Sequence, residues 1–233
     1  MTVPDLAGGR DQYCAESRAL PSSPRAQGMG DLTDETITAA FRLLLQLGRP
    51  LKAAQIASEL NAELSAVRAE LDRLDAAGRI RRTAGEHVVG SAGLSVAPAA
   101  HELRLDSRRF WTWCAYDVVG IAGALRADAR SMSYSPATGA QIRLQFAAGR
   151  PPATPVVVLF PADRGSARTI DDWCSNANFF ESREAALTWS AQHKIEGEVI
   201  DLREARRRGL AHWGPMLSAN RGIESREDHG DNG

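Results

Sequence analysis

Two short aromatic segments of this 233-residue chain contain side chains that could bind a soft metal or transfer a proton. The first segment, residues 110–117, carries Cys114 and Asp117 three positions apart. We expect this segment to be helical, which would place both side chains on one face about one turn apart. The second segment, residues 169–180, carries Cys174 beside a tryptophan. A thiol and a carboxyl in one pocket could combine metal binding or nucleophilic attack with proton transfer.

The neighbours of Cys114 and Asp117 would influence their chemistry. Aromatic rings lower the local dielectric, which keeps a carboxyl protonated and able to donate a proton near neutral pH. The aromatic residues of this segment are Phe110, Trp111, Trp113 and Tyr116. Alternatively, Cys114 and Cys174 are small buried hydrophobes, as free cysteines commonly are, and Asp117 is a surface or capping residue. Each motif taken alone favours this structural interpretation.

Cysteine usage and composition narrow the class of protein. The three cysteines, at positions 14, 114 and 174, are odd in number and far apart, which predicts reduced thiols and no disulfide framework. The 28 basic and 29 acidic side chains nearly balance, so there is no bulk attraction to nucleic acid or to an anionic membrane. No apolar run approaches the roughly 20 residues needed to cross a bilayer, and the start of the chain lacks the apolar core of a signal peptide. We therefore expect a cytoplasmic protein that binds neither nucleic acid nor membrane.

The chain divides into four parts by its sequence pattern. Residues 1–30 and 219–233 lack apolar periodicity and are expected to be a flexible N-terminal extension and a flexible C-terminal tail. Residues 31–90 are expected to form a helical module, and residues 91–218 a second domain that begins with a linker at 91–100. The predicted fold class is α+β, with a winged-helix-like three-helix module followed by a mixed β-sheet domain flanked by helices.

The helical module has the element order of a winged helix. Thr33 is suited to cap the first helix, because acidic residues follow it in the first turn. Residues 53–60 and 64–77 show the apolar spacing of two further helices. Residues 80–89 predict a β-hairpin that turns near Gly85.

The charge of this module argues against DNA binding, the usual role of a winged helix. Residues 33–90 contain eight basic and eight acidic side chains, and the third predicted helix carries more acidic than basic residues. A protein that binds duplex DNA usually concentrates positive charge on the face that enters the groove. We therefore expect the module to scaffold or shield the second domain.

The second domain mixes predicted helices and strands. The helices are expected at 109–125, at 182–192 with Ser182 as the cap, and in a basic segment that ends at Gly209. The strands are expected at 141–146, 155–160 and 197–201. Scattered histidines at positions 101, 193 and 212 lack metal-ligand spacing and are expected to be structural.

Taken in order, these motifs resemble one known family, the organomercurial (alkylmercury) lyases, over roughly residues 33–215. The shared motifs are the winged-helix-like module, the Trp113 to Asp117 segment, the Pro-Ala-Thr-Gly turn at 136–139, a buried valine strand, the segment from Cys174 to Phe180, and residues 189–197 with His193 and Glu196. The resemblance implies that Cys114, Asp117 and Cys174 are the catalytic set and bind the mercury of substrate and product. It also implies an alkylmercury-lyase-like catalytic domain at 91–218.

The sequence departs from the family's common pattern at two positions. Ser175 stands where many members carry a second adjacent cysteine, and Ser135 lies where some carry a further one. Neither position belongs to the implied catalytic set. Fewer spare thiols would be available to hold or pass on the metal, and the substrate preference is left open.

The chemistry of the three residues fits this reaction. Hg(II) is a soft cation, and two thiolates would bind an alkyl- or arylmercury more strongly than nitrogen or oxygen ligands. Asp117 would then deliver a proton to the departing carbon, which gives a hydrocarbon and Hg(II). No organic cofactor is needed. Low-molecular-weight thiols or a mercuric reductase would be expected to remove the product ion.

Two other functions remain compatible with the sequence. The chain could be a thiol-based regulator of transcription that senses a soft metal, although the uncharged module counts against this. It could also be a relative whose same three residues cleave a different bond in a biosynthetic pathway, because fold and residues do not determine the substrate.

Replacement of Cys14 by Ser should leave turnover unchanged, because Cys14 lies in the extension without apolar or aromatic partners at regular spacing. The measurement is hydrocarbon release from phenylmercury by the purified variant in excess thiol. A loss as large as that caused by Cys114→Ser would mean that the extension contributes to the site.

Overall fold

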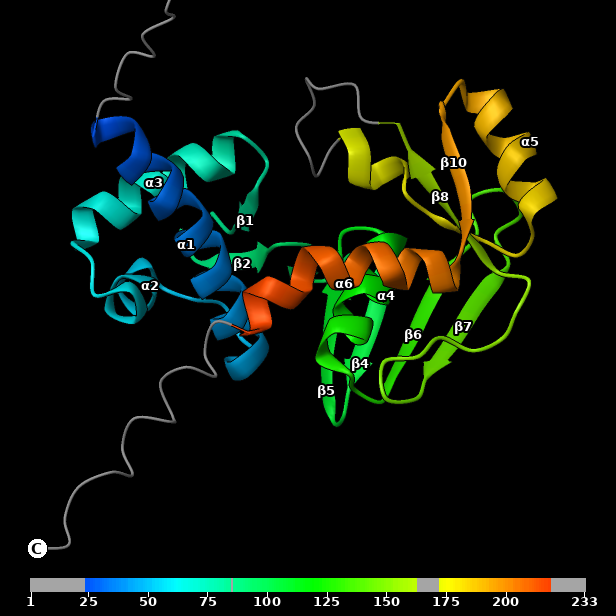
Figure 1. The fold of residues 1–233 in the computed structure, drawn as a ribbon, viewed down its shortest axis with the longest axis horizontal. Coiled ribbons are helices and arrows are strands. Elements are labelled where there is room, and N and C mark those ends of the chain that lie inside the picture. Colours follow the sequence, from blue (N-terminus) through cyan, green and yellow to red (C-terminus); the bar gives the residue numbers. More distant parts are fainter. Residues whose placement is uncertain (1–23, 85, 163–171, 219–233) are drawn as a thin grey trace, which may run out of the picture.

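Figure 1 shows the fold of the protein as a computed structural model, which describes residues 24–84, 86–162 and 172–218. The expectations for Cys14, for Gly85, for most of the extension and for the tail at 219–233 fall outside these ranges. Within the described ranges, no helix has the length and apolarity that spanning a bilayer requires.

The described chain contains six α-helices and ten strands. The helices are α1 (Pro24–Leu47), α2 (Ala53–Leu60), α3 (Leu64–Ala76), α4 (Ala115–Leu125), α5 (Arg183–His193) and α6 (Leu202–Ser218), with a short 3-10 helix η2 (Cys174–Asn176). The strands are β1 (Ile80–Arg82), β2 (Val88–Ser91), β3 (Leu94–Ser95), β4 (His101–Leu105), β5 (Arg108–Thr112), β6 (Ala129–Tyr134), β7 (Gln141–Phe146), β8 (Val157–Pro161), β9 (Phe179–Phe180) and β10 (Gly197–Asp201).

The described strands form two sheets. The larger has seven strands in the order β1-β2-β3-β5-β4-β6-β7, and the smaller has three in the order β10-β8-β9. All of these pairs are antiparallel. The predicted α+β class is therefore confirmed, but the sheets are antiparallel where a mixed sheet was expected.

The helical module has the predicted element order, with three helices followed by the β1–β2 hairpin. The start of the first helix differs from the prediction, because α1 begins at Pro24 and Thr33 lies inside it. The hydroxyl of Thr33 does not cap the helix but accepts a hydrogen bond from Arg73 of α3 at 2.6 Å. A contact between two helices thus replaces the expected cap.

The junction between the two parts of the chain is a β-structure and not a linker. The segment 91–100 contains β3, which pairs with β2 on one side and with β5 on the other. The larger sheet therefore runs without interruption from the helical module into the second domain.

The predicted helix at 109–125 is wrong in its first third. Residues 108–112 form β5, which pairs with β4 in a hairpin, and α4 begins only at Ala115. The sequence of β5 contains Phe110, Trp111 and Thr112, which are aromatic and β-branched residues that favour strands. The helical pattern of the following apolar residues masked this preference.

The remaining predictions for the second domain agree with the structure apart from some boundaries. Strand β7 covers 141–146, β10 covers 197–201, and α5 is capped by Ser182, whose hydroxyl accepts from the Ala185 amide. Strand β8 is displaced slightly, to 157–161. The basic helix α6 continues nine residues beyond its expected end at Gly209, to Ser218.

Helices α4 and α6 pack closely against each other beside the larger sheet. Figure 1 shows α6 running from β10 toward the helical module, alongside α4. The two helices approach at Gly120 and Gly209, where a Cβ on Gly209 would overlap the Cα of Gly120. The Trp213 ring fills the space above Gly120, where a side chain on that residue would collide with it. Glycine at these positions therefore sets the distance between the two helices.

Gly209→Ala should destabilise the protein by about 1–3 kcal/mol, because the added methyl group would overlap backbone atoms that cannot move aside separately. The measurement is the free energy of unfolding from a denaturant titration. Arg203→Ala, an exposed position on the same helix, serves as the control and should change the stability by less than about 0.5 kcal/mol. Equal stability of the two variants would contradict the close packing of α4 and α6.

Candidate active site

Cys114 is positioned by the change from strand β5 to helix α4. It is the N-cap residue of α4, with extended backbone angles, and Asp117 occupies the third position of the helix. The Cys114 amide donates to Asp117 Oδ2 at 3.0 Å, and the thiol accepts from the Asp117 amide. This reciprocal pairing is a capping box in which a cysteine replaces the usual serine or threonine. The predicted spacing therefore does bring the two residues together, but as a helix cap and not as one face of a continuous helix.

Cys174 reaches the same place from the segment between β8, the central strand of the smaller sheet, and the edge strand β9. It begins the 3-10 helix η2, which precedes β9. The Ala115 amide donates to the Ala177 carbonyl at 2.8 Å, and the Ala177 amide donates to the Cys174 carbonyl. These backbone bonds attach η2 to the first turn of α4, so the two cysteines are held together by main-chain contacts.

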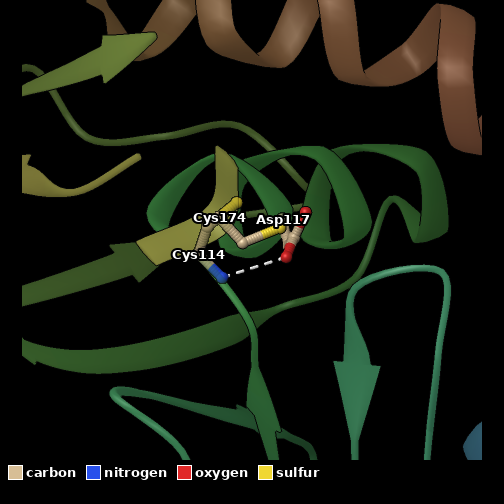
Figure 2. Close-up of side chains that lie close together, drawn as sticks. All are labelled: Cys114, Asp117 and Cys174. Atoms are coloured by element: carbon tan, nitrogen blue, oxygen red, sulfur yellow. Dashed lines mark hydrogen bonds between the residues drawn. The ribbon is translucent and has the colours of Figure 1, made fainter. Parts of the chain in front are cut away.

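The three predicted residues converge, as Figure 2 shows. One ligand atom from each of Cys114, Asp117 and Cys174 lies within 4.8 Å of the others, and all three residues are buried. In the described ranges this is the one group of three or more such side chains that could hold a metal ion. Two sulfur ligands and one oxygen ligand suit a soft cation.

Burial dominates the electrostatics of the group. It raises the pKa of the Asp117 carboxyl to about 7, although hydrogen bonds from Cys114 and Trp113 oppose the change. Burial also raises the pKa of the Cys114 thiol well above its ordinary value, and the hydrogen bond with Cys174 and the charge of Asp117 add to the effect. At neutral pH the Cys114 sulfur therefore holds its proton, and the Asp117 carboxyl can hold one as well.

Some of the aromatic residues expected near the site line it, and others belong to the main hydrophobic core. Trp113 packs with both cysteines, and Tyr116 and Trp173 border the same cluster. Tyr116 also contacts the rings of Phe160 and Trp213. Phe110, by contrast, belongs to the main hydrophobic core and not to the site. The apolar surroundings expected from the sequence are therefore present, but they come from several elements.

The other residues singled out in the sequence contribute no ligand atom to this group. Ser135 is buried and accepts a hydrogen bond from the Ala137 amide, whereas Ser175 is exposed next to Cys174. Each of the three histidines contacts a neighbouring side chain. His101 hydrogen-bonds to Ser133, His193 stacks on Trp189, and the ring of His212 lies edge-on to Trp213.

Two functional neighbours were missed by the sequence analysis. Gly93 lies so close to Asp117 that a Cβ at this position would be 2.5 Å from the carboxyl carbon. Trp213 of α6 donates from Nε1 to the carbonyl of Ala92, the residue before Gly93, at 2.9 Å. The only signal in the sequence was Gly93 itself, because glycine accepts the positive φ that a tight turn requires.

Comparison with known proteins places the chain in a family. A family model described as alkylmercury lyase matches residues 94–213. The chain belongs to the alkylmercury lyase family. It is 30% identical over 178 residues to an alkylmercury lyase from Staphylococcus epidermidis, a match that covers 71% of this chain and 77% of that protein. It is 29% identical over 171 residues to one from Pseudomonas putida, which covers 70% of this chain and 78% of the relative.

A solved structure of the family shares the fold. The crystal structure of the mercury-bound form of MerB2 superposes with a TM-score of 0.72 and covers 82% of this chain and 98% of that one. The two sequences are 22% identical. The resemblance stated from the motifs is therefore confirmed at the level of family and of fold.

The pKa of Asp117 predicts how stability depends on pH. The folded state holds the proton up to about pH 7, while the unfolded chain releases it near the ordinary value of 3.8. The stabilising effect of the bound proton is thus complete below about pH 4 and is lost as the pH rises toward 7. Relative to Asp117→Asn, the wild-type protein should lose at most about 1.4 kcal/mol of stability per pH unit in this window.

The measurement is the free energy of unfolding of both proteins at several pH values between 4 and 8. A constant difference between them across this range would show that the buried carboxyl keeps an ordinary pKa.

Proposed function

We propose that this chain cleaves the carbon–mercury bond of alkyl- and arylmercury compounds by protonolysis, giving a hydrocarbon and Hg(II). Cys114 and Cys174 are the mercury ligands, and Asp117 is the proton donor. The observation that carries this assignment is the convergence of these three side chains within 4.8 Å in a buried site. Membership of the alkylmercury lyase family supports the choice of substrate class.

The first steps are ligand exchange at mercury. One thiol replaces the leaving ligand of the organomercurial, and its proton departs with that ligand. The second thiol then coordinates the same mercury atom, because its sulfur lies within reach of the first. Two soft sulfur donors increase the electron density on mercury and so polarise the bond to carbon.

Bond cleavage requires a proton at the departing carbon. The Asp117 carboxyl lies beside the Cys114 amide and holds its proton up to about pH 7, so it can act as a general acid under neutral conditions. After it protonates the carbon, it takes the proton released by the second thiol. The carboxyl is thereby restored, and Hg(II) is left bound by two thiolates with no change in oxidation state.

The surroundings of the site favour this reaction. Cys114 is fully buried, and the exposed fractions of Cys174 and Asp117 are 4% and 5%. Exclusion of water strengthens the electrostatic effect of the carboxyl on the reacting bond. We further propose that low-molecular-weight thiols, and a mercuric reductase as the final acceptor, remove the product by exchange at mercury.

The remaining parts of the chain are proposed to support this site. Residues 31–90 act as a winged-helix-like module that scaffolds the catalytic domain at 91–218 and does not bind nucleic acid, an assignment supported by the balanced charge of the module. We place the protein in the cytoplasm, where thiols are reduced.

Asp117→Asn should bind an organomercurial but release hydrocarbon more slowly by a factor on the order of 10²–10⁴, the usual loss for a missing general acid. Cys114→Ser and Cys174→Ser should lose both binding and cleavage, because a hydroxyl is a hard and protonated ligand. The measurement is benzene release from phenylmercury in excess thiol, together with mercury retained on the protein.

Asp106→Asn is the matched control for this experiment. Asp106 is exposed on the turn between β4 and β5 and has a positive φ of 54°, which asparagine tolerates. This variant should keep the wild-type rate. Cleavage at the wild-type rate by Asp117→Asn would show that another group supplies the proton.

A further inference from the structure

The tip of the β2–β3 hairpin lies directly against the proposed proton donor. The hairpin turns through two residues, Ala92 and Gly93, which have positive φ values of 47° and 85°. Two positive φ values are the signature of a type I′ turn, which favours glycine at its second position. Gly93 is also the residue whose missing side chain leaves room for the Asp117 carboxyl, since a Cβ would lie within 2.5–2.8 Å of its carbon and oxygen atoms.

Both carbonyl groups of this turn are held by the catalytic domain. The indole of Trp213, on α6, donates to the Ala92 carbonyl at 2.9 Å. The amide of Trp113, next to Cys114, donates to the Gly93 carbonyl at 3.0 Å. The second bond attaches the turn to the same short segment that carries the cysteine.

The helical module holds the turn from the other side. Ser91, the last residue of β2, is fully buried, and its hydroxyl donates to the Ile37 carbonyl of α1 at 2.8 Å. Ser91 also pairs with Leu94 across the hairpin. The turn is thus attached to α1, to α6 and to the start of α4, although it contributes no reactive group of its own.

Ala92 adds a further indication that the turn has a specific purpose. An alanine in the left-handed region is unfavourable, and such conformations persist only where the surrounding contacts over-determine them. The contacts that do so here are the bonds to Trp213 and Trp113. The backbone is therefore held in a costly conformation at Ala92, directly before the glycine that faces the carboxyl.

We propose that the Ala92–Gly93 turn is a positioning element for catalysis, which holds the Asp117 carboxyl beside Cys114 and which the helical module keeps in place through Ser91. This inference rests on the proposed function of Asp117. It gives the helical module a role in cleavage without any contact with the substrate. Gly93 is a positioning residue, because it acts only through the carboxyl that it touches.

Because the atoms nearest to a Cβ on residue 93 belong to Asp117 and not to either cysteine, a change in the turn should affect bond cleavage and not mercury binding. The carboxyl would have to turn away from a side chain on residue 93, whereas both sulfur atoms belong to other segments. A displacement of about 1 Å between reacting groups can lower a rate by about 10²-fold. Disturbing the turn should therefore reduce kcat and spare the binding of mercury by the two thiols.

The test is Gly93→Ala, compared with Gly48→Ala as a matched control. Gly48 also has a positive φ, of 62°, but a Cβ there would meet only the Arg108 side chain at an ordinary 3.7 Å. Both variants carry the same kind of backbone strain, and only one of them presses on Asp117. We expect kcat for benzene release from phenylmercury to fall about 10- to 100-fold in Gly93→Ala and to stay at the wild-type value in Gly48→Ala.

The second measurement is titration with inorganic Hg(II), followed by the ultraviolet absorption of the mercury–thiolate bonds. Gly93→Ala should bind one equivalent with the wild-type spectrum, and its KM should be unchanged. Unchanged kcat in Gly93→Ala would overturn the proposal. So would a parallel loss of mercury binding, because the turn would then shape the whole pocket and not the carboxyl alone.

Two milder variants cover the case in which Gly93→Ala does not fold. Ser91→Ala removes the bond to α1, and Trp213→Phe removes the donor to Ala92 while keeping a ring beside Gly120. Each should lower kcat with KM and Hg(II) binding retained, and wild-type kcat in both would overturn the proposal. Failure of the wild-type protein itself to release benzene would count against the proposed function, which distinguishes the two results.

Discussion

A carboxyl group and two thiols lie together in a buried site, and the elements around them satisfy the constraint that this burial imposes. An ionised carboxylate is costly to bury, and the hydrogen bonds that Asp117 receives come from the Cys114 thiol and from the Cys114 and Trp113 backbone, which carry no full positive charge. The positive end of the helix would favour the charged form, yet burial outweighs it. The Asp117 carboxyl therefore keeps a proton beside the two sulfur atoms, where the carbon released from mercury in the proposed reaction would accept it.

Each element around the site positions a different residue. The end of β5 turns the chain so that Cys114 can cap α4, and η2 brings Cys174 to the same point through backbone bonds to Ala115. Helix α6 approaches α4 closely because both carry glycine at the contact. That approach places the Trp213 indole over the Ala92 carbonyl. The packing of α6 on α4 thus helps to hold the Ala92–Gly93 turn, which borders the site.

The sequence predicted that Cys114, Asp117 and Cys174 would lie together, but it was less accurate about the elements that carry them. The three-residue spacing of Cys114 and Asp117 brings side chains together in a continuous helix and in a helix cap alike, so the pair was found for a partly wrong reason. The start of α4 was missed because β5 depends on pairing with β4, a tertiary contact. Gly93 was missed because its role depends on Asp117, which is 24 positions away and reaches it only in the folded chain.

The continuous seven-stranded sheet has a consequence for how the chain can come apart. Strand β2 of the helical module completes the hydrogen bonding of β3, and β3 in turn covers the edge of β5. Separation of the module would expose unpaired backbone groups along a strand edge, a surface prone to aggregation. The two parts are thus expected to melt in a single cooperative transition.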